Sequence, residues 1–222
     1  MTRVCLLHTV AALPAVFDPL VRELAPDTRP YHVVDESLLA DTIAHGPLPR
    51  TAARLAAYVQ HAEAAGAEAV LVTCSSVGPA AEAARPLAGI PVLRVDEPMA
   101  AEAVRTGPRI GVLATLASTL EPTTDLIRRQ AAAAGVAADL TATTCPGAYE
   151  ARTAGRAAEH DTLIAAEAER LAARCDVLVL AQASMAAAIP ADALPIPVLT
   201  SPRSGTAQLA ALKDPKDPKD RT

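Results

Sequence analysis

Aromatic residues and an excess of basic residues are both missing from this sequence. Its 222 residues include no Trp, three Tyr and one Phe, and 20 Lys and Arg against 25 Asp and Glu give a formal net charge of -5. A protein that binds nucleic acid needs basic side chains for the phosphates, and one that binds single strands adds aromatic stacking surfaces. The composition therefore argues against a nucleic-acid partner.

Long apolar runs and paired cysteines are missing as well. No stretch of about 18 to 20 residues is free of charge and proline, which a membrane span would require, and the first apolar run, residues 4–7, is too short for a signal peptide. The four cysteines form no C-x-x-C pair, and no His/Cys cluster or glycine-rich nucleotide motif occurs. We expect a cytoplasmic protein with reduced thiols, no membrane partner, no metal and no nucleotide cofactor.

The sequence instead alternates short β-branched runs with longer alanine-rich stretches, and 51% of its residues are hydrophobic. This alternation is typical of an α/β fold with largely parallel sheets. Strands are predicted at residues 4–8, 69–73, 92–95, 110–114, 177–180 and 198–200, and helices at 50–65, 79–84, 121–134 and 161–174. Gly66, Gly89 and Gly135 follow predicted helices, where a left-handed residue commonly ends the helix.

An internal repeat divides the chain into two halves. Residues 3–10 align with residues 109–116 at an offset of 106, and residues 69–76 align with 177–184 at an offset of 108. The repeat predicts two similar α/β lobes, residues 1–105 and 106–212, followed by a disordered tail at 213–222 with repeated Lys-Asp-Pro.

Two facing lobes of this kind would enclose one binding cleft. Ligands of open parallel sheets bind outside the carboxyl ends of the strands, so residues that follow the predicted strands should line the cleft. These are Thr9, Cys74, Ser75, Ser76, Thr115, Ser118, Thr119, Gln182, Ala183 and Ser184.

Cys74 is the strongest candidate for a reactive group. It lies between a predicted strand and a predicted helix, where unpaired N–H groups favour a thiolate and a bound carboxylate. Cys5, Cys145 and Cys175 lie in apolar or strand-edge segments and are predicted to pack as small buried side chains.

Four motifs together carry a resemblance to a known family: Thr73-Cys74-Ser75-Ser76, Asp96-Glu97-Pro98-Met99, residues 113–119 and the Asp-Val-Leu-Val-Leu run at 176–180. The chain resembles the aspartate/glutamate racemase superfamily, which includes hydantoin racemases, maleate isomerase and arylmalonate decarboxylase. The resemblance covers nearly everything except the tail. It implies two three-layer lobes with parallel-rich sheets related by a pseudo-twofold axis, a cofactor-independent active site in the cleft between them, and homo-oligomers.

In the racemases of this superfamily a cysteine from each lobe faces the α-carbon of the substrate. Here the second position is Gln182, which the internal repeat independently aligns with Cys74. A neutral amide is no acid or base near pH 7, although it can donate hydrogen bonds to a carboxylate or enediolate. We therefore interpret the chain as a one-cysteine variant in which reversible inversion by two thiols is not expected.

His8 is a candidate to replace the missing acid or base. An imidazole in the cleft could polarise the substrate or pair with a Cys74 thiolate. Alternatively, His8 ends its strand bonded to the backbone, and the sequence leaves both roles open. His32 is more simply explained as a residue of a second strand. Tyr149 and Glu150 fall where the resembling racemases carry an acidic residue.

The resemblance also implies that Thr115, Ser118 and Thr119 hold a substrate carboxylate, although turn capping would explain the same hydroxyls. The expected function is that of a cofactor-independent racemase or isomerase that uses a cysteine thiolate at the α-carbon of a small carboxylate or amino acid. The alternatives are a one-base decarboxylase or isomerase of a small dicarboxylate, and a carboxylate-binding protein without turnover.

Overall fold

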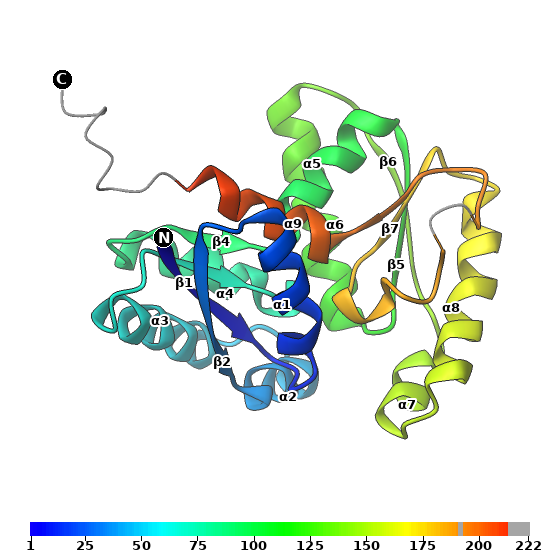
Figure 1. The fold of residues 1–222 in the computed structure, drawn as a ribbon. Helices are drawn as coiled ribbons and strands as arrows, with labels where there is room; N and C mark the ends of the chain where they lie inside the picture. Colours follow the sequence, from blue (N-terminus) through cyan, green and yellow to red (C-terminus); the bar gives the residue numbers. More distant parts are fainter. Residues whose placement is uncertain (191–192, 213–222) are drawn as a thin grey trace.

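Two four-stranded parallel sheets form the framework of the protein. The computed structural model describes residues 1–190 and 193–212, so the predicted tail lies outside the described residues. The strand order is β2-β1-β3-β4 in the first sheet and β6-β5-β7-β8 in the second (Figure 1). The strands are β1 (Thr2–His8), β2 (Thr28–Val34), β3 (Ala69–Val72), β4 (Val92–Arg94), β5 (Arg109–Ala114), β6 (Asp139–Thr144), β7 (Val177–Leu180) and β8 (Val198–Thr200). The equivalent orders confirm the predicted two-lobed α/β fold.

The two central strand pairs explain why the internal repeat was readable. In the first sheet Val4 pairs with Ala69, and in the second Ile110 pairs with Val177, each at the start of a parallel ladder. These strands are buried on both faces, and the sequence of such a strand is a continuous apolar run. The edge strands β2 and β6 are only partly buried and contain polar residues, so they carry a weaker apolar signal. The sequence pattern assigned only His32 of β2 to a strand, and β6 was not predicted.

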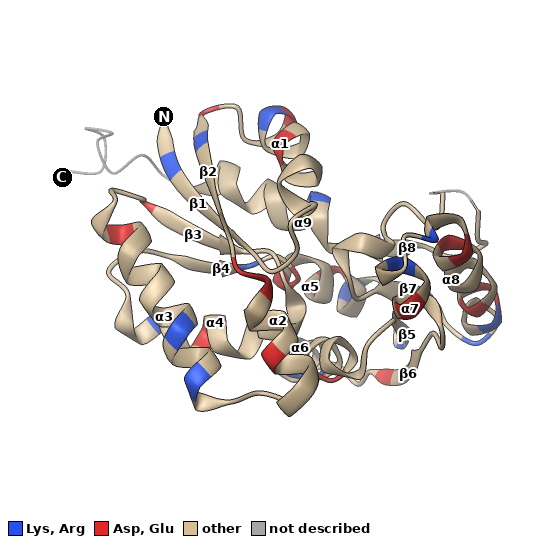
Figure 2. Cartoon of the chain, turned by 90° about the horizontal axis from the view of Figure 1, so that it is seen from below, with Lys and Arg blue, Asp and Glu red and all other residues tan. Residues whose placement is uncertain are grey.

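Helices cover both sheets. The four that were predicted agree with the observed bounds to within four residues at each end. The helices are α1 (Leu13–Leu24), α2 (Glu36–His45), α3 (Pro49–Ala64), α4 (Gly78–Ala84), α5 (Glu97–Thr106), α6 (Ala117–Ala134), α7 (Ala148–Thr153), α8 (Ala157–Ala172) and α9 (Ser201–Ala207). The sequence pattern predicted α3, α4, α6 and α8 but not the others. Figure 2 shows charges of both signs on outer helices such as α3 and α8, whereas the strands carry few.

Two of the three predicted left-handed glycines have a positive φ. Gly66 follows α3 with φ 82°, and Gly135 ends α6 with φ 69°. The prediction for Gly89 is wrong, because its φ is not positive. Its N–H group donates to the Glu63 carboxylate 3.2 Å away, and a β-carbon at this position would meet that same carboxylate. The contact at Gly89 is thus with the end of a flexible side chain, and no turn requires glycine here.

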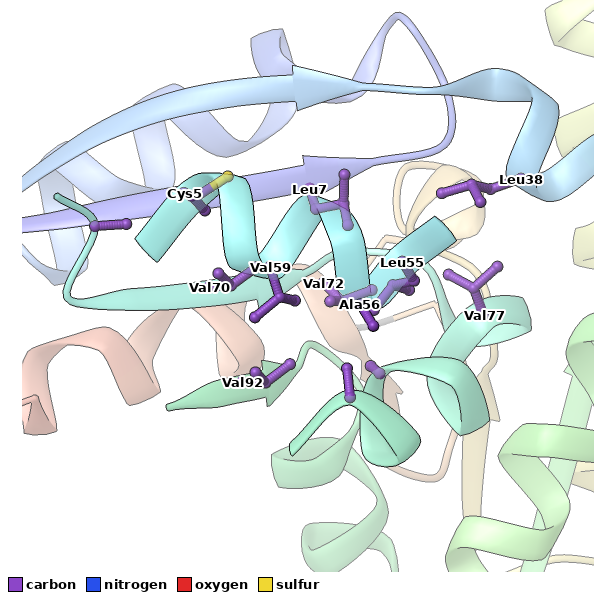
Figure 3. Packing of buried hydrophobic residues seen from close by; sticks show 14 residues of the cluster. Cys5, Leu7, Leu38, Leu55, Ala56, Val59, Val70, Val72, Val77 and Val92 are labelled. Carbon is purple, nitrogen blue, oxygen red and sulfur yellow. The ribbon is translucent and has the colours of Figure 1, made fainter. Parts of the chain in front are cut away.

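Separate apolar clusters hold the helices on the sheets. On one face of the first sheet, Cys5, Leu7, Val70 and Val72 pack against side chains of α3 and α4 that include Leu55 (Figure 3). Phe17 and Val21 of α1 pack on the opposite face. Two further clusters bury the second sheet in the same manner.

The last helix of each half of the chain packs against the sheet or helices of the other lobe. Met99 and Ala103 of α5, which belongs to the first half of the chain, pack against the core of the second sheet. Helix α9 ends the second half but packs on α1 and α5, and Leu209, just after it, enters the core of the first sheet (Figure 1). The lobe boundary at residue 105 stays a prediction, and the two lobes are tied together by this exchange.

Among the described residues, no helix combines the length and the apolar character needed to cross a membrane.

Candidate active site

A cavity lies between the two lobes, at the carboxyl ends of their strands. Its volume is about 80 Å³. It is lined by Thr9, Val10, Leu13, Leu39, Thr73, Cys74, Ser75, Ser76, Thr115, Leu116, Thr119, Tyr149, Arg152, Gln182, Ala183 and Ser184. The structure thus brings together nine of the eleven predicted site residues, with His8 and Ser118 outside the lining.

Cys74 and Gln182 occupy matching positions in the two lobes. Each follows a buried four-residue strand by two positions and precedes a three-residue 3-10 helix. Their backbones are alike, with φ -127° and ψ 117° at Cys74 and φ -123° and ψ 137° at Gln182. The repeat therefore places a partly exposed thiol and an amide on the same cavity from opposite lobes.

Thr115 fixes the orientation of the Gln182 amide. The Thr115 backbone N–H donates to Gln182 Oε1 at 2.5 Å, and its hydroxyl donates to the same oxygen at 2.9 Å. Because a backbone N–H can only donate, the atom that faces it must be the amide oxygen. The NH₂ group of Gln182 is left to donate elsewhere. The predicted role of Thr115 as a direct carboxylate donor does not fit this geometry, since both of its donor groups are bonded to Gln182.

Small hydroxyls supply the remaining polar lining. Ser76 Oγ and Thr119 Oγ1 lie 2.8 Å apart and join the two lobes beside the cavity. Thr9 Oγ1 is buried and has no hydrogen-bond partner among the described residues. A buried hydroxyl without a partner costs free energy, so a bound ligand that pairs with Thr9 would gain from it.

Arg152 is a cavity residue that the sequence pattern did not predict. It lies one helical turn after Tyr149 on α7, so both side chains reach the cavity from the helix that follows edge strand β6. Among the described residues that line the cavity, Arg152 is the one charged side chain and none is Asp or Glu. The signal that could have found it was the position of α7 after a strand whose carboxyl end faces the cleft, but β6 itself was not predicted.

Glu150 and Ser118 do not take the places expected of them. Glu150 is exposed and does not line the cavity, because α7 turns Tyr149 and Arg152 inward instead. Ser118 lines a separate groove between α2 and α6, and its buried Oγ has no partner in the described part of the chain.

His8 is fully buried behind the cavity wall and is not positioned to contact a ligand. Its Nδ1 lies 2.7 Å from Thr73 Oγ1, and its Nε2 lies 2.8 Å from His32 Nδ1. Burial, followed by the charge of nearby His32, lowers the pKa of His8 to about 4 even though Asp18 opposes the shift. The neutral form is therefore the stable one near pH 7. His32, predicted as a strand residue, is indeed in β2, but it bonds to His8.

The other three cysteines differ from Cys74 because they are buried. Desolvation raises the pKa of Cys5 to about 11, with a smaller opposing effect from Tyr31, and it also raises the pKa of Cys145 and of Cys175. Only Cys74 of the four lines the cavity. Within residues 1–190 and 193–212, no group of three or more His, Cys, Asp or Glu side chains is arranged to hold a metal ion.

Comparison with known families matches this arrangement to one of them. A family model described as Asp/Glu/Hydantoin racemase matches residues 8–209. The chain belongs to this family. No curated protein sequence gives a match to this racemase-family chain.

Solved structures share the fold at low sequence identity. A candidate Asp/Glu racemase from Yersinia pestis has a TM-score of 0.74 and 16% identity, over 95% of this chain and 98% of that one. An aspartate racemase from Picrophilus torridus has a TM-score of 0.70 and 12% identity, over 95% and 94% of the two chains. For an allantoin racemase from Klebsiella pneumoniae the values are 0.66 and 16%, over 96% and 87%. The racemase-family chain therefore has the two-lobed fold of these proteins.

Proposed function

We propose that this protein is a cofactor-independent enzyme in which Cys74 transfers a proton at the α-carbon of a small carboxylic acid. Support for the proposal comes from the placement of Cys74 on the inter-lobe cavity, opposite an amide that can only donate to a ligand. In such an enzyme the Cys74 thiolate removes the α-proton, and the electron pair moves into the carboxylate to give an enediolate. Gln182 then donates hydrogen bonds to the developing negative charge.

The charge of the cavity supports an acidic ligand. Arg152 is the only charged side chain among its described lining residues, and the hydroxyls of Thr9, Ser75 and Ser184 add donors. An Arg side chain binds a carboxylate in a planar, bidentate manner. A substrate ammonium would meet no carboxylate on this wall, so we favour a dicarboxylate or a 2-substituted acid without an α-amino group.

A reaction confined to one face of the α-carbon is favoured by the amide at residue 182. After proton abstraction or loss of CO₂, the enediolate would receive a proton from the Cys74 thiol on the face that it occupies. The second candidate is therefore a one-base decarboxylase or isomerase of a small dicarboxylate, and both candidates use the same enediolate.

Exchange of the α-proton with deuterated water tests the proposal. The purified protein is incubated with 2-hydroxy, 2-amino and 2-aryl mono- and dicarboxylates, and deuterium incorporation and CO₂ release are followed by NMR. We expect exchange or decarboxylation of at least one acid with a single stereochemical outcome. Cys74→Ala should lower the rate by roughly 10²-fold or more, the usual contribution of a positioned proton-transfer group.

Cys175→Ala is the matched control, because Cys175 is buried in the core of the second lobe away from the cavity. It should retain exchange. Arg152→Gln should raise KM for dicarboxylates more than for monocarboxylates, because it removes the cation. If no acid shows exchange or CO₂ release while binding persists unchanged in Cys74→Ala, the catalytic proposal is wrong and the protein only binds its ligand.

A further inference from the structure

A line of four hydrogen-bonded side chains runs from the cavity wall to the surface of the first lobe. Thr73 Oγ1 lies 2.7 Å from His8 Nδ1, His8 Nε2 lies 2.8 Å from His32 Nδ1, and His32 Nε2 lies 2.9 Å from Asp18 Oδ1. Thr73 precedes Cys74 and lines the cavity. At the other end the side chains of Asp18 and His32 are 42% and 20% exposed. The line thus connects solvent with the residue beside the proposed catalytic thiol.

Three elements hold the two imidazole rings in place. His8 ends central strand β1, His32 lies on edge strand β2, and α1 packs over them with Asp18 and Phe17. The ring planes differ by 14°, with 5.1 Å between centroids, so the two rings lie nearly parallel. Neither ring can turn away without losing a bond at each of its nitrogens.

Asp18 is the carboxylate that faces this pair from α1. Asp35 and Glu36, the other carboxylates near the ends of β1 and β2, are engaged elsewhere. Asp35 is bound by Arg54, and Glu36 accepts a hydrogen bond from the Ala11 N–H. The ionisable groups that act on His8 through their charge are His32 and Asp18.

The donors and acceptors of the line can be arranged in two ways. In the first, both histidines are neutral, and every donor points outward: Thr73 O–H to His8 Nδ1, His8 Nε2–H to His32 Nδ1, and His32 Nε2–H to the Asp18 carboxylate. All bonds are satisfied, because a neutral imidazole has one donor nitrogen and one acceptor nitrogen.

The second arrangement contains one more proton. If His32 is an imidazolium, both of its nitrogens donate, one to Asp18 and the other to His8 Nε2. His8 then carries its proton on Nδ1 and donates to Thr73 Oγ1, and the Thr73 hydroxyl donates to the Leu7 carbonyl, 3.2 Å away. His8 is neutral in both arrangements, but its tautomer and the direction of the Thr73 hydroxyl are reversed.

We propose that His32 is a proton-responsive positioning residue, whose protonation from solvent reverses the His8 tautomer and turns the Thr73 hydroxyl beside Cys74. The reaction balances with one proton taken from water and no other reactant. In the neutral arrangement both lone pairs of Thr73 Oγ1 are free, whereas in the protonated arrangement one of them accepts from His8 Nδ1. The reversal itself occurs in the free protein, and only its effect on rate rests on the proposed function.

Nitrogen-15 NMR of the histidine rings tests the reversal without any substrate. In the free protein between pH 5 and 8.5, His8 should stay neutral and change from the Nε2–H to the Nδ1–H tautomer as the pH falls, together with the charging of His32. If His8 keeps one tautomer throughout, or becomes the charged ring, the proposal is overturned.

Two variants separate this role from a merely structural one. Asp18→Asn keeps an acceptor for His32 but removes the negative charge, so the midpoint of the tautomer change should fall by about one pH unit. His32→Gln cannot take up a proton and should abolish the change. His45→Gln, at an exposed position on α2, should leave the change as it is. If His32→Gln does not fold, Asp18→Asn at the half-exposed end still decides, and an unmoved midpoint in that variant contradicts the proposal.

The pH profile of α-proton exchange provides the link to the cavity. A step in the rate should coincide with the tautomer change, move with it in Asp18→Asn and persist in His45→Gln. A tautomer change in a protein that exchanges no acid would leave this inference standing and overturn the proposed function. If the protein exchanges the α-proton of an acid but the His8 tautomer never changes, the proposed function stands and this inference is overturned.

Discussion

At the scale of single residues, burial decides which cysteine is available for chemistry. Desolvation raises the pKa of Cys5, Cys145 and Cys175, and all three are buried, whereas Cys74 is partly exposed on the cavity. The thiolate is the reactive form, so burial lowers both the accessibility and the ionisation of Cys5, Cys145 and Cys175.

Iodoacetamide should therefore label Cys74 first in the native protein at pH 7. Peptide mass spectrometry after a short exposure should find at least about tenfold more adduct on Cys74 than on any other cysteine, because the other thiols require local opening. A small carboxylate bound in the cavity should slow this labelling. Preferential modification of Cys145 or Cys175 would contradict the placement of the site.

At the scale of secondary-structure elements, α9 shows how a close backbone contact joins the halves of the chain. A β-carbon added to Gly205 would lie 2.3 Å from the Val95 carbonyl oxygen and 2.5 Å from Val95 Cγ2. A backbone carbonyl cannot rotate away as a side chain can, so α9 would have to shift away from Val95 and the first lobe.

Gly205→Ala should accordingly lower the free energy of unfolding by about 1 to 3 kcal/mol, as overpacking does, although alanine favours helix by about 1 kcal/mol. Urea unfolding at constant pH measures the change. Ser204→Ala, one residue earlier in α9, removes only side-chain bonds to the preceding turn and should change stability by less than about 0.5 kcal/mol. Unchanged or greater stability of Gly205→Ala would show that α9 is not packed as described.

At the scale of the whole molecule, the two lobes place different side chains on opposite sides of the cavity. The matching positions of Cys74 and Gln182 mean that the second lobe offers a hydrogen-bond donor where a second acid or base would be needed for inversion. Under the proposed function, this difference between lobes determines the stereochemistry.

Gln182→Cys should then introduce two-way racemisation of an acid that the cavity already binds. The racemisation rate should exceed that of the natural protein by about tenfold or more. A second thiol would supply the missing proton transfer, which contributes roughly 10² to 10⁴ where it is well positioned. Chiral chromatography from each pure enantiomer measures the rate. Gln182→Ala, which loses the same bonds to Thr115 but gains no thiol, is the matched control and should show no gain. Rapid two-way racemisation by the natural protein that is unchanged in either variant would disprove the role given to residue 182.

Local sequence patterns determined much of this molecule. Continuous apolar runs mark the central strands because those strands are buried on both faces, and the repeat of these runs predicted two equivalent lobes. Parallel sheets bring strand ends to one edge, so the amino-acid sequence alone was enough to place the residues that follow those strands, including Cys74 and Gln182, on a common cleft.

Only the tertiary structure decided the features that depend on contacts between distant segments. Arg152 reaches the cavity on a helix that follows a polar edge strand, and such strands have no clear apolar alternation. His8 has the sequence position of a cleft residue but is covered by α1 and bonded to His32, because a strand-end side chain can face either the cleft or the neighbouring layer. The exchange of α5 and α9 between lobes likewise has no local signal, since the same apolar face could pack on either sheet. Apolar patterning determines which side chains must be buried, and three-dimensional packing decides what buries them.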